Sequence, residues 1–426
     1  MDNRHGGALG RRTWALGVAL VALMSPAQAQ DAWKETDLDY LLTLSLEQVR
    51  ALVPLRKPIT SWGKFPLEGY ARWHPQRPRE VTIKGETLIP EERFPPTSLM
   101  VLTGPQGERY EYPYFTDSLG NPLYPTVVTD RAARDFFVTA VQRLTARYAE
   151  RQERQAALVA LAILHRLAEA YRGYPLYGRL SQRGRFAIPE QEPYPETTGK
   201  WQDWYYQLDP IEPGLLARSY AVLRQTAVVD ELAAALGRDV RADIEEYFFL
   251  DLVRLVQRYD GWMLAAGRAL NDNFMPARAL GLARIARALE QPEVFHYAFD
   301  NLADILQARF MVDGVFPESP GYHSTALNPI SEAAVEMTGY SDPPHYQPAP
   351  PRSRFDHLRP ETIMPLLARA REFRQVARYP DGRLWPVHDT PGQSVGTPST
   401  ETVSRLFSRF QEDGLIEVHQ KHVRIL

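Results

Sequence analysis

The chain contains no cysteine, so no disulfide can hold it together and its stability has to come from a buried core. It has no excess of positive charge either. The 49 lysines and arginines stand against 52 aspartates and glutamates, for a net charge of −3, which argues against nucleic acid as a partner. No His-Glu-x-x-His pair and no Gly-rich phosphate loop occurs, so the sequence predicts no metal site and no cofactor.

Long hydrophobic runs are confined to the N-terminus. Arg11-Arg12 precedes an apolar run from Trp14 to Met24, and Ala27-Gln28-Ala29 supplies the small residues of a cleavage site. This pattern is typical of a bacterial secretory signal over residues 1–29. No later run approaches the roughly 18 apolar residues that a membrane span needs. We therefore expect a periplasmic or secreted protein that does not cross a membrane.

The body of the chain divides into an irregular part and a helical part. Residues 30–128 are rich in proline and aromatic side chains, and extended patterns at 80–84 and 109–113 predict a few short strands. From Asp130, a residue type favoured at helix N-caps, apolar residues recur at helical spacing. Further helical patterns follow at 155–171, 214–226, 228–236, 242–259, 276–289, 292–310, 324–337 and 361–376.

Successive helices joined by short connections predict an all-α fold of antiparallel helical hairpins, either an open toroid or a compact bundle. We assign residues 129–410 to this domain. Residues 341–351 interrupt it as a long surface loop, because each proline there fixes φ and removes a donor. Residues 411–426 contain strand-like stretches at 415–418 and 422–426, so we read them as the start of a β domain.

Three stretches carry the candidate chemistry. Asp313-Gly314-Val315-Phe316-Pro317-Glu318-Ser319-Pro320-Gly321-Tyr322-His323 places a tyrosine and a histidine just after a turn-rich loop. Asn271-Asp272-Asn273-Phe274-Met275-Pro276 stands at a helix entrance one hairpin earlier, and a later loop runs from 380 to 390. Together they resemble the heparinase II/III-like polysaccharide lyases, with the similarity covering about residues 171–390.

The resemblance implies an incomplete (α/α) toroid that cleaves a uronic-acid-containing polysaccharide by β-elimination. Such a reaction removes the C5 proton beside a carboxylate, whose charge has to be neutralised by a hydrogen-bond donor or a cation. The resemblance assigns this neutralisation to Asn273 and the acid/base step to Tyr322. The residues expected to contact the acidic polysaccharide are Asn271, Glu318, His323, Trp385, His388 and Asp389.

Each assignment has a structural alternative. Asn271 or Asn273 can serve simply as a helix cap, and Tyr322 as an ordinary half-buried aromatic. His323 is either a substrate contact or a core residue, and Glu318 can set the local loop. His388 and Asp389 either line the cleft or support it. Trp201 is either a sugar-stacking platform or an anchor for the following helices.

The resemblance also has a gap. Members of the family usually continue into a C-terminal β-sandwich that supplies a catalytic histidine, whereas this chain stops at Leu426. We expect either a truncated or a toroid-only relative, with little activity as it stands. Two other functions stay open. A glycoside hydrolase would need two carboxylates across a cleft, for which only Glu318 and Asp389 can be nominated. A non-catalytic glycan-binding protein would need no acid or base.

Overall fold

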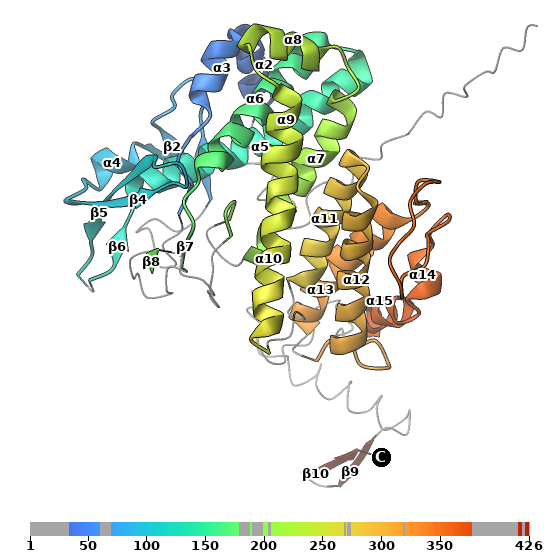
Figure 1. Cartoon of the computed structure of the whole chain (residues 1–426). Coiled ribbons are helices and arrows are strands. Elements are labelled where there is room, and N and C mark those ends of the chain that lie inside the picture. The colour runs from blue at the N-terminus through green and yellow to red at the C-terminus, as the bar shows by residue number, and fades with distance from the viewer. Residues whose placement is uncertain are drawn as a thin grey trace, which may run out of the picture. The chain divides into compact units, whose positions relative to one another are not determined.

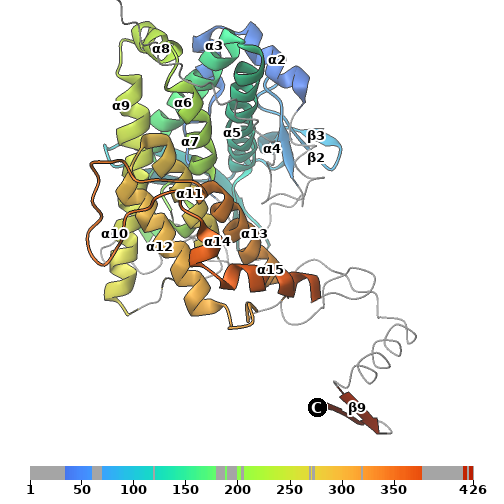
Figure 2. The ribbon, with the colours of Figure 1, turned by 90° about the vertical axis from the view of Figure 1, so that its right-hand side faces the viewer.

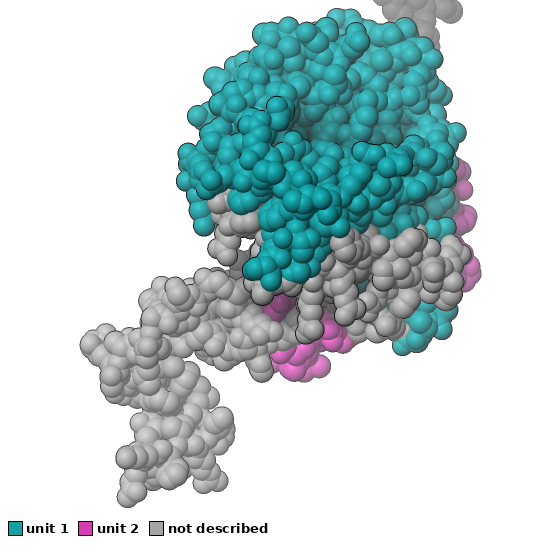
Figure 3. Space-filling view, turned by 90° about the vertical axis from the view of Figure 1, so that its left-hand side faces the viewer, with its two compact units in different colours: residues 1–269, 281–295 teal, residues 270–280, 296–426 magenta. Residues whose placement is uncertain are grey.

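The computed structural model describes residues 34–59, 70–118, 120–178, 188–189, 199–202, 206–267, 270, 274–317, 320–376, 416–419 and 422–425. This part of the chain is mostly helical, with small antiparallel sheets (Figure 1), which confirms the predicted predominance of helix. The chain forms two compact units, coloured separately in Figure 3. Unit 1 comprises residues 1–269 and 281–295, and unit 2 comprises residues 270–280 and 296–426. Within the described ranges, no helix combines the length and apolar character that crossing a membrane requires.

The N-terminal part of unit 1 is more regular than the sequence predicts. Helices α2 (Glu35–Thr43) and α3 (Leu46–Leu52) open it. Ser45 caps α3, since its hydroxyl accepts the Gln48 N–H and the Gln48 side chain accepts the Ser45 N–H. Leu38 and Leu41 of α2 and Val49 of α3 are buried. Two short helices therefore form where an irregular segment was expected.

Two small antiparallel sheets follow. Strands β1 (Ala71–Trp73), β2 (Val81–Ile83) and β3 (Glu86–Leu88) form the first, and the β2–β3 turn has positive φ at Lys84 and Gly85, as a tight hairpin requires. After α4 (Pro90–Arg93), strands β4 (Ser98–Thr103), β5 (Arg109–Thr116) and β6 (Pro122–Leu123) form the second. The strands predicted at 80–84 and 109–113 are confirmed by β2 and β5.

The core of unit 1 is built on two long helices that pack against each other, α5 (Pro125–Arg151) and α6 (Arg154–Gly173) (Figure 2). The predicted N-cap at Asp130 is wrong. Helix α5 begins a turn earlier, at Pro125, whose fixed φ suits a first helical position. Asp130 instead lies inside the helix and pairs with Arg56 at 2.8 Å. Helix α6 is buried from Ala156 to His165, which confirms the prediction of a helix covered on every face.

The rest of unit 1 continues the helical pattern. A hairpin of β7 (Tyr177–Gly178) and β8 (Ile188–Pro189) and a 3₁₀ turn at Tyr206–Leu208 lead into α7 (Ile211–Leu223) and α8 (Val228–Leu236). The helix predicted at 242–259 is a composite of α9 (Val240–Ile244), a π-helical turn at Glu245–Leu250 and α10 (Asp251–Ala265). Trp201 is fully buried and its indole donates to Glu212 at 2.7 Å, so it anchors α7 and is no exposed platform for sugar.

The remaining helices lie in unit 2, apart from residues 281–295, which belong to unit 1. The predicted helix at 276–289 is α11 (Met275–Leu289), whose first residues belong to unit 2, and the predicted start of α12 (Pro292–Arg309) at Pro292 is confirmed. Helices α13 (Pro320–Met337), α14 (Pro360–Ile363) and α15 (Leu366–Val376) follow, and α13 packs against both later helices. The stretches predicted as strands near the C-terminus pair as β9 (Ile416–His419) and β10 (His422–Ile425).

The proline-rich loop at 341–351 forms no helix, as predicted. A buried contact between a histidine and a carboxylate holds it to α12. The ring of His296 lies 3.0 Å from the Asp342 carboxylate and stacks on Phe355 with 4.2 Å between ring centroids. The same carboxylate accepts the Phe355 N–H at 2.7 Å. The loop is therefore fixed at its base.

A carboxyl group between α5 and α7 makes the stability of unit 1 depend on pH. Burial, with Glu212 nearby, raises the pKa of the Asp135 carboxyl to about 6. A raised folded-state pKa means that the folded chain holds the proton more tightly than the unfolded chain. The stabilisation that comes from protonated Asp135 is therefore present below about pH 4 and lost by about pH 6. We expect Asp135→Asn, which mimics the protonated acid, to raise the unfolding free energy at pH 7.5 by about 2 kcal/mol.

Urea unfolding at pH 4 and pH 7.5 measures this effect. The gain from Asp135→Asn should disappear at pH 4, where the carboxyl of the unchanged chain is itself protonated. Glu150→Gln, at an exposed position of the same helix, is the matched control and should leave the unfolding free energy unchanged at both pH values. A gain of equal size at both pH values would contradict the titration of Asp135.

Candidate functional site

Of the predicted site residues, Tyr322 and His323 lie in the described part of unit 2. Six others fall outside the described residues, and their roles stay predictions: Asn271, Asn273, Glu318, Trp385, His388 and Asp389. The described residues include those that hold the Tyr-His pair.

The Asp-Gly pair before the Tyr-His segment forms a tight turn, as the sequence predicts. Gly314 has φ +87°, its N–H donates to the Met311 carbonyl at 2.8 Å, and the Asp313 carboxylate accepts the Val315 N–H at 3.2 Å. The turn lies against α15. A Cβ on residue 314 would come within 2.8 Å of the Ala370 Cα and closer still to backbone atoms of Arg369 and Ala370. Only glycine satisfies both the positive φ and this close approach.

His323 lies in the first turn of α13 and is 1 % exposed. Its Nδ1 accepts the Phe316 N–H at 3.2 Å, so Nε2 carries the proton and donates to the Ala370 carbonyl at 2.9 Å. Phe310 and Phe373 meet the ring edge to face, at centroid distances of 5.7 and 4.9 Å. This geometry corresponds to the core alternative for His323. The ring ties the 311–317 turn, α13 and α15 together.

Tyr322 precedes His323 in the same helical turn and is half-buried. The sequence predicted a helix from Ser324 onwards, with the Tyr-His pair just before it. The structure starts α13 four residues earlier, at Pro320, a residue favoured in a first turn. Because neighbouring residues of a helix point in directions about 100° apart, fixing the His323 ring inward also fixes the direction of the Tyr322 side chain.

Gly314→Ala is expected to destabilise the chain by about 3 kcal/mol, because it combines a strained φ with a clash against the α15 backbone. Urea unfolding measures the loss. Gly339→Ala is the matched control, since Gly339 also has a positive φ of +75° but a Cβ there would meet no atom within 4 Å. It should cost only the strain, about 1 kcal/mol. Equal losses would show that the close approach to α15 contributes nothing.

The start of α11, directly after the Asn271–Asn273 segment, is also anchored. Arg278 is fully buried, its guanidinium donates to the Asn301 side chain of α12 and lies 5.9 Å from the Tyr297 ring centroid. Its N–H donates to the Phe274 carbonyl at 3.1 Å. Sequence reasoning did not single out Arg278, because an arginine in a helical pattern ordinarily faces solvent.

Across the ranges that the structure describes, no group of three or more histidine, cysteine, aspartate or glutamate side chains could hold an ion.

Comparison with known proteins gives one short match. Residues 398–416 match a family described as bacterial regulatory proteins, crp family, and no curated protein matches the chain. The match covers a small part of the chain and does not assign it to that family. It overlaps the predicted start of a β domain.

Two signals in this C-terminal stretch were missed by the sequence reasoning. Apolar residues recur there at helical spacing, at Val403, Leu406, Phe407 and Phe410. Shortly before them, residues 392–396 read Gly-Gln-Ser-Val-Gly, which fits the Gly-x-Ser-x-Gly pattern of a serine nucleophile. Both signals lie outside the described residues. Of the matched residues 398–416, the structure describes Ile416 alone.

Proposed function

We propose that the chain is an exported polysaccharide lyase of the heparinase II/III-like type, with its helices arranged as an incomplete (α/α) toroid. It would cleave a uronate-containing polysaccharide by β-elimination. The observation that supports this most is the first turn of α13. There a tyrosine stays half-exposed while the adjoining histidine is buried and bonded through both ring nitrogens.

The reaction divides into steps that the proposed residues can perform. A base removes the C5 proton, and the electron pair of that C–H bond forms the C4–C5 double bond as the C4–O bond breaks. The departing oxygen takes a proton. Tyr322 would act as base, as acid or as both in turn. The Asn273 amide would donate to the uronate carboxylate, where negative charge builds up as the proton leaves.

In this proposal His323 is a positioning residue. Its bonds to the Phe316 N–H and the Ala370 carbonyl leave the imidazole no free nitrogen for substrate. Direct contact with the polysaccharide would fall to Asn271, Glu318, Trp385, His388 and Asp389. A rigid first turn of α13 serves catalysis because an acid/base group has to be held within hydrogen-bond reach of the proton that it transfers.

The test is a panel of uronate polysaccharides incubated with the purified chain and, because we expect little activity of the chain as it stands, with the product of the full-length gene as well. The unsaturated uronate formed by β-elimination absorbs in the ultraviolet, and new reducing ends are measured in parallel. Both signals together support a lyase. New reducing ends without ultraviolet absorbance would move the assignment to a glycoside hydrolase. Binding of the polysaccharide without cleavage would move it to a glycan-binding protein. N-terminal sequencing of protein recovered from the periplasm or medium tests export, with Gln30 expected as the first residue.

We propose a regulatory role for the C-terminal segment as a second candidate function, on the strength of the match to bacterial regulatory proteins at residues 398–416. Between the apolar residues of that stretch, the sequence carries residue types that contact phosphates and bases in other proteins, namely Ser404, Arg405, Ser408 and Arg409. The β9–β10 hairpin begins at its last residue. The partner consistent with these side chains is double-stranded DNA, against the expectation drawn from net charge.

A mobility-shift titration with mixed-sequence duplex DNA at two salt concentrations tests the second candidate. A retarded band that weakens as salt rises would support it, since phosphate contacts release counterions. The paired change Arg405→Gln and Arg409→Gln should abolish the shift. Absence of any shift at low salt would remove this candidate and leave the lyase proposal untouched.

A further inference from the structure

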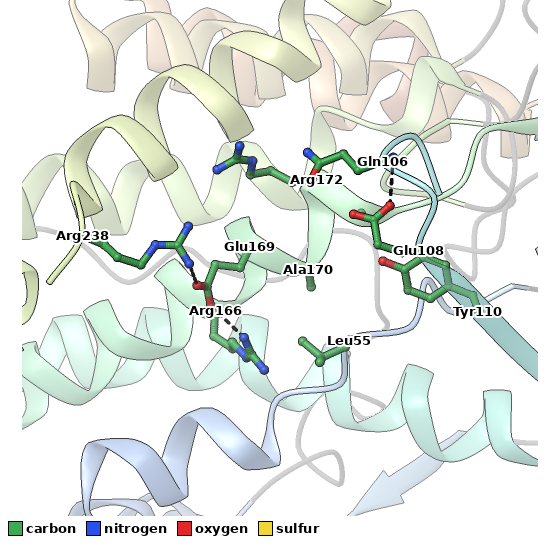
Figure 4. Close-up of a pocket in the computed structure, with 10 residues that line it drawn as sticks. Leu55, Gln106, Glu108, Tyr110, Arg166, Glu169, Ala170, Arg172 and Arg238 are labelled. Atoms are coloured by element: carbon green, nitrogen blue, oxygen red, sulfur yellow. Dashed lines mark hydrogen bonds and ion pairs between the residues drawn. The ribbon is translucent and has the colours of Figure 1, made fainter. Parts of the chain in front are cut away.

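Unit 1 contains a pocket of about 370 Å³ whose described lining includes neither Tyr322 nor His323. It lies between the C-terminal turns of α6 and the hairpin formed by β4 and β5, with Leu55 and Arg238 at its edges (Figure 4). Two glycines let these elements approach. A Cβ at Gly173 would run into the Tyr110 hydroxyl, and one at Gly104 would run into the Gly173 carbonyl oxygen. The volume suits a ligand the size of one or two sugar rings.

One wall of the pocket is cationic. Arg166, Arg172 and Arg238 line it together with Glu169, as Figure 4 shows. Glu169 pairs with Arg166 at 2.9 Å and also with Arg238 and Arg50. The Glu169 carboxylate therefore holds three guanidinium groups close to one another.

Behind this wall a second carboxylate is shared in the same way. Asp243 pairs with Arg172 at 3.0 Å and with Arg238 at 3.2 Å. Four guanidinium groups thus share two carboxylates. The neighbouring His165 adds no charge, because burial lowers its pKa and its Nδ1 accepts a hydrogen bond from Arg50. Positive charge remains in excess, and the buried Nε–H of Arg166 has no hydrogen-bond partner within the described part of the chain.

The opposite wall is made of acceptors and a hydroxyl from β5 and the turn before it. Glu108 accepts the Gln106 N–H at 3.0 Å through one carboxylate oxygen, and its side chain stands beside Tyr110 in Figure 4. Burial and the adjacent Glu108 raise the pKa of Tyr110 to about 12, so its hydroxyl keeps its proton at neutral pH and can donate. Leu55 and Ala170 add apolar surface between the walls.

We propose that this pocket is a binding site for a small sugar acid, whose carboxylate meets the arginine wall and whose hydroxyls meet Glu108 and Tyr110. A simple anion such as phosphate fits less well, because the Glu108 carboxylate would repel it and the second wall would lie unused. An uncharged sugar would leave the excess of positive charge without a partner. The proposal concerns a different set of residues from the lyase site and does not depend on lyase activity.

The test is calorimetric titration of the full chain with D-glucuronate, D-glucose, acetate and inorganic phosphate as separate probes. Glucuronate should bind at least about tenfold more tightly than each of the other three, since only it satisfies both walls. Arg172→Gln should weaken glucuronate binding about tenfold or more. Arg109→Gln is the matched control, because Arg109 lies on the same hairpin, is exposed and pairs with Glu111 outside the pocket. It should leave binding unchanged within about twofold.

Tyr110→Phe covers the case in which Arg172→Gln disturbs folding, because it removes one oxygen and keeps the ring. It should weaken glucuronate binding by about three- to tenfold while the circular dichroism and unfolding midpoint stay close to those of the unchanged chain. Glucuronate binding that survives both substitutions would overturn the assignment to this pocket. Phosphate binding as tightly as glucuronate would reduce the pocket to a general anion site, and no heat with any probe would reject it as a ligand site.

Discussion

In a form of the protein that shows lyase activity, Tyr322→Phe is expected to lower the turnover of a uronate polysaccharide by about 10² to 10⁴ and to leave the fold intact. The substitution removes the oxygen that our proposal assigns to proton transfer with the sugar, and loss of a positioned acid/base group typically costs this much. It leaves the ring, and so the packing at the first turn of α13, in place. The measurement is the rate of unsaturated-uronate formation, with turnover and the Michaelis constant determined separately.

A role in proton transfer predicts that turnover falls while the Michaelis constant changes little, whereas a residue that only contacts substrate would alter the Michaelis constant. Tyr340→Phe is the matched control. Tyr340 is another half-buried tyrosine of unit 2, three residues after the end of α13, and its replacement also removes one oxygen. If Tyr322→Phe keeps more than half of the activity, the acid/base assignment fails.

His323 gives a second way to examine the same turn. Because its ring bonds to the Phe316 N–H and the Ala370 carbonyl, its replacement should act through structure, lowering stability and turnover together. An asparagine or glutamine at this position can offer both an acceptor and a donor, but with a different reach. Partial recovery of turnover in one of these two variants, compared with alanine, would separate positioning from direct chemistry.

The helices that the sequence predicts well are those in which one pattern dominates. Helix α6 is apolar along its whole buried stretch, so no alternative structure competes with it, and α8 matches its predicted bounds, 228–236. Helices α2, α3 and α4, which the sequence analysis missed, are all short. Helix α3 depends on the Ser45–Gln48 cap and the burial of Val49. A helix of seven residues shows little apolar periodicity in its sequence, so contacts of this kind are hard to predict.

The errors arise where tertiary contacts override a local preference. Asp130 fits an N-cap, but burial of Val127 and the fixed φ of Pro125 extend α5 past it, and Arg56 then supplies its partner. The π-helical turn at Glu245–Leu250 lies inside what the sequence shows as one helix, because a single turn of this kind has no residue signature that distinguishes it from α-helix.

The candidate site also has features that the sequence predicts and features that it does not. The turn at Asp313-Gly314 could be predicted, since an Asp-Gly pair favours positive φ at the glycine. What fixes His323 could not, because its partner carbonyl belongs to Ala370 on α15, far along the chain. The same holds for the Arg278–Asn301 contact between α11 and α12. Residue types and spacing therefore indicate the chemistry, while the directions of the side chains depend on contacts between distant helices.

Asn273→Ala is expected to lower turnover by about 10² or more. The proposed amide donates to the substrate carboxylate, and that bond strengthens as the C5 proton leaves and charge accumulates on the carboxylate oxygens. An interaction made mainly in the transition state lowers turnover when it is lost, with less effect on binding of the ground state. The same absorbance assay measures this loss.

Alanine alone cannot separate catalysis from capping, since Asn273 stands just before α11 (Met275–Leu289) and asparagine is favoured at an N-cap. Asn273→Ser makes the distinction, because serine caps a helix about as well as asparagine but is too short to reach the same carboxylate. A capping role predicts that serine restores both stability and turnover. The lyase proposal predicts that serine restores stability alone and leaves turnover about 10² below that of the unchanged chain. Asn271→Ser, the same change two residues earlier, should have a smaller effect on turnover. If it instead causes the larger loss, the neutralising amide belongs to Asn271, because the two asparagines are the candidates that the resemblance places at this helix entrance.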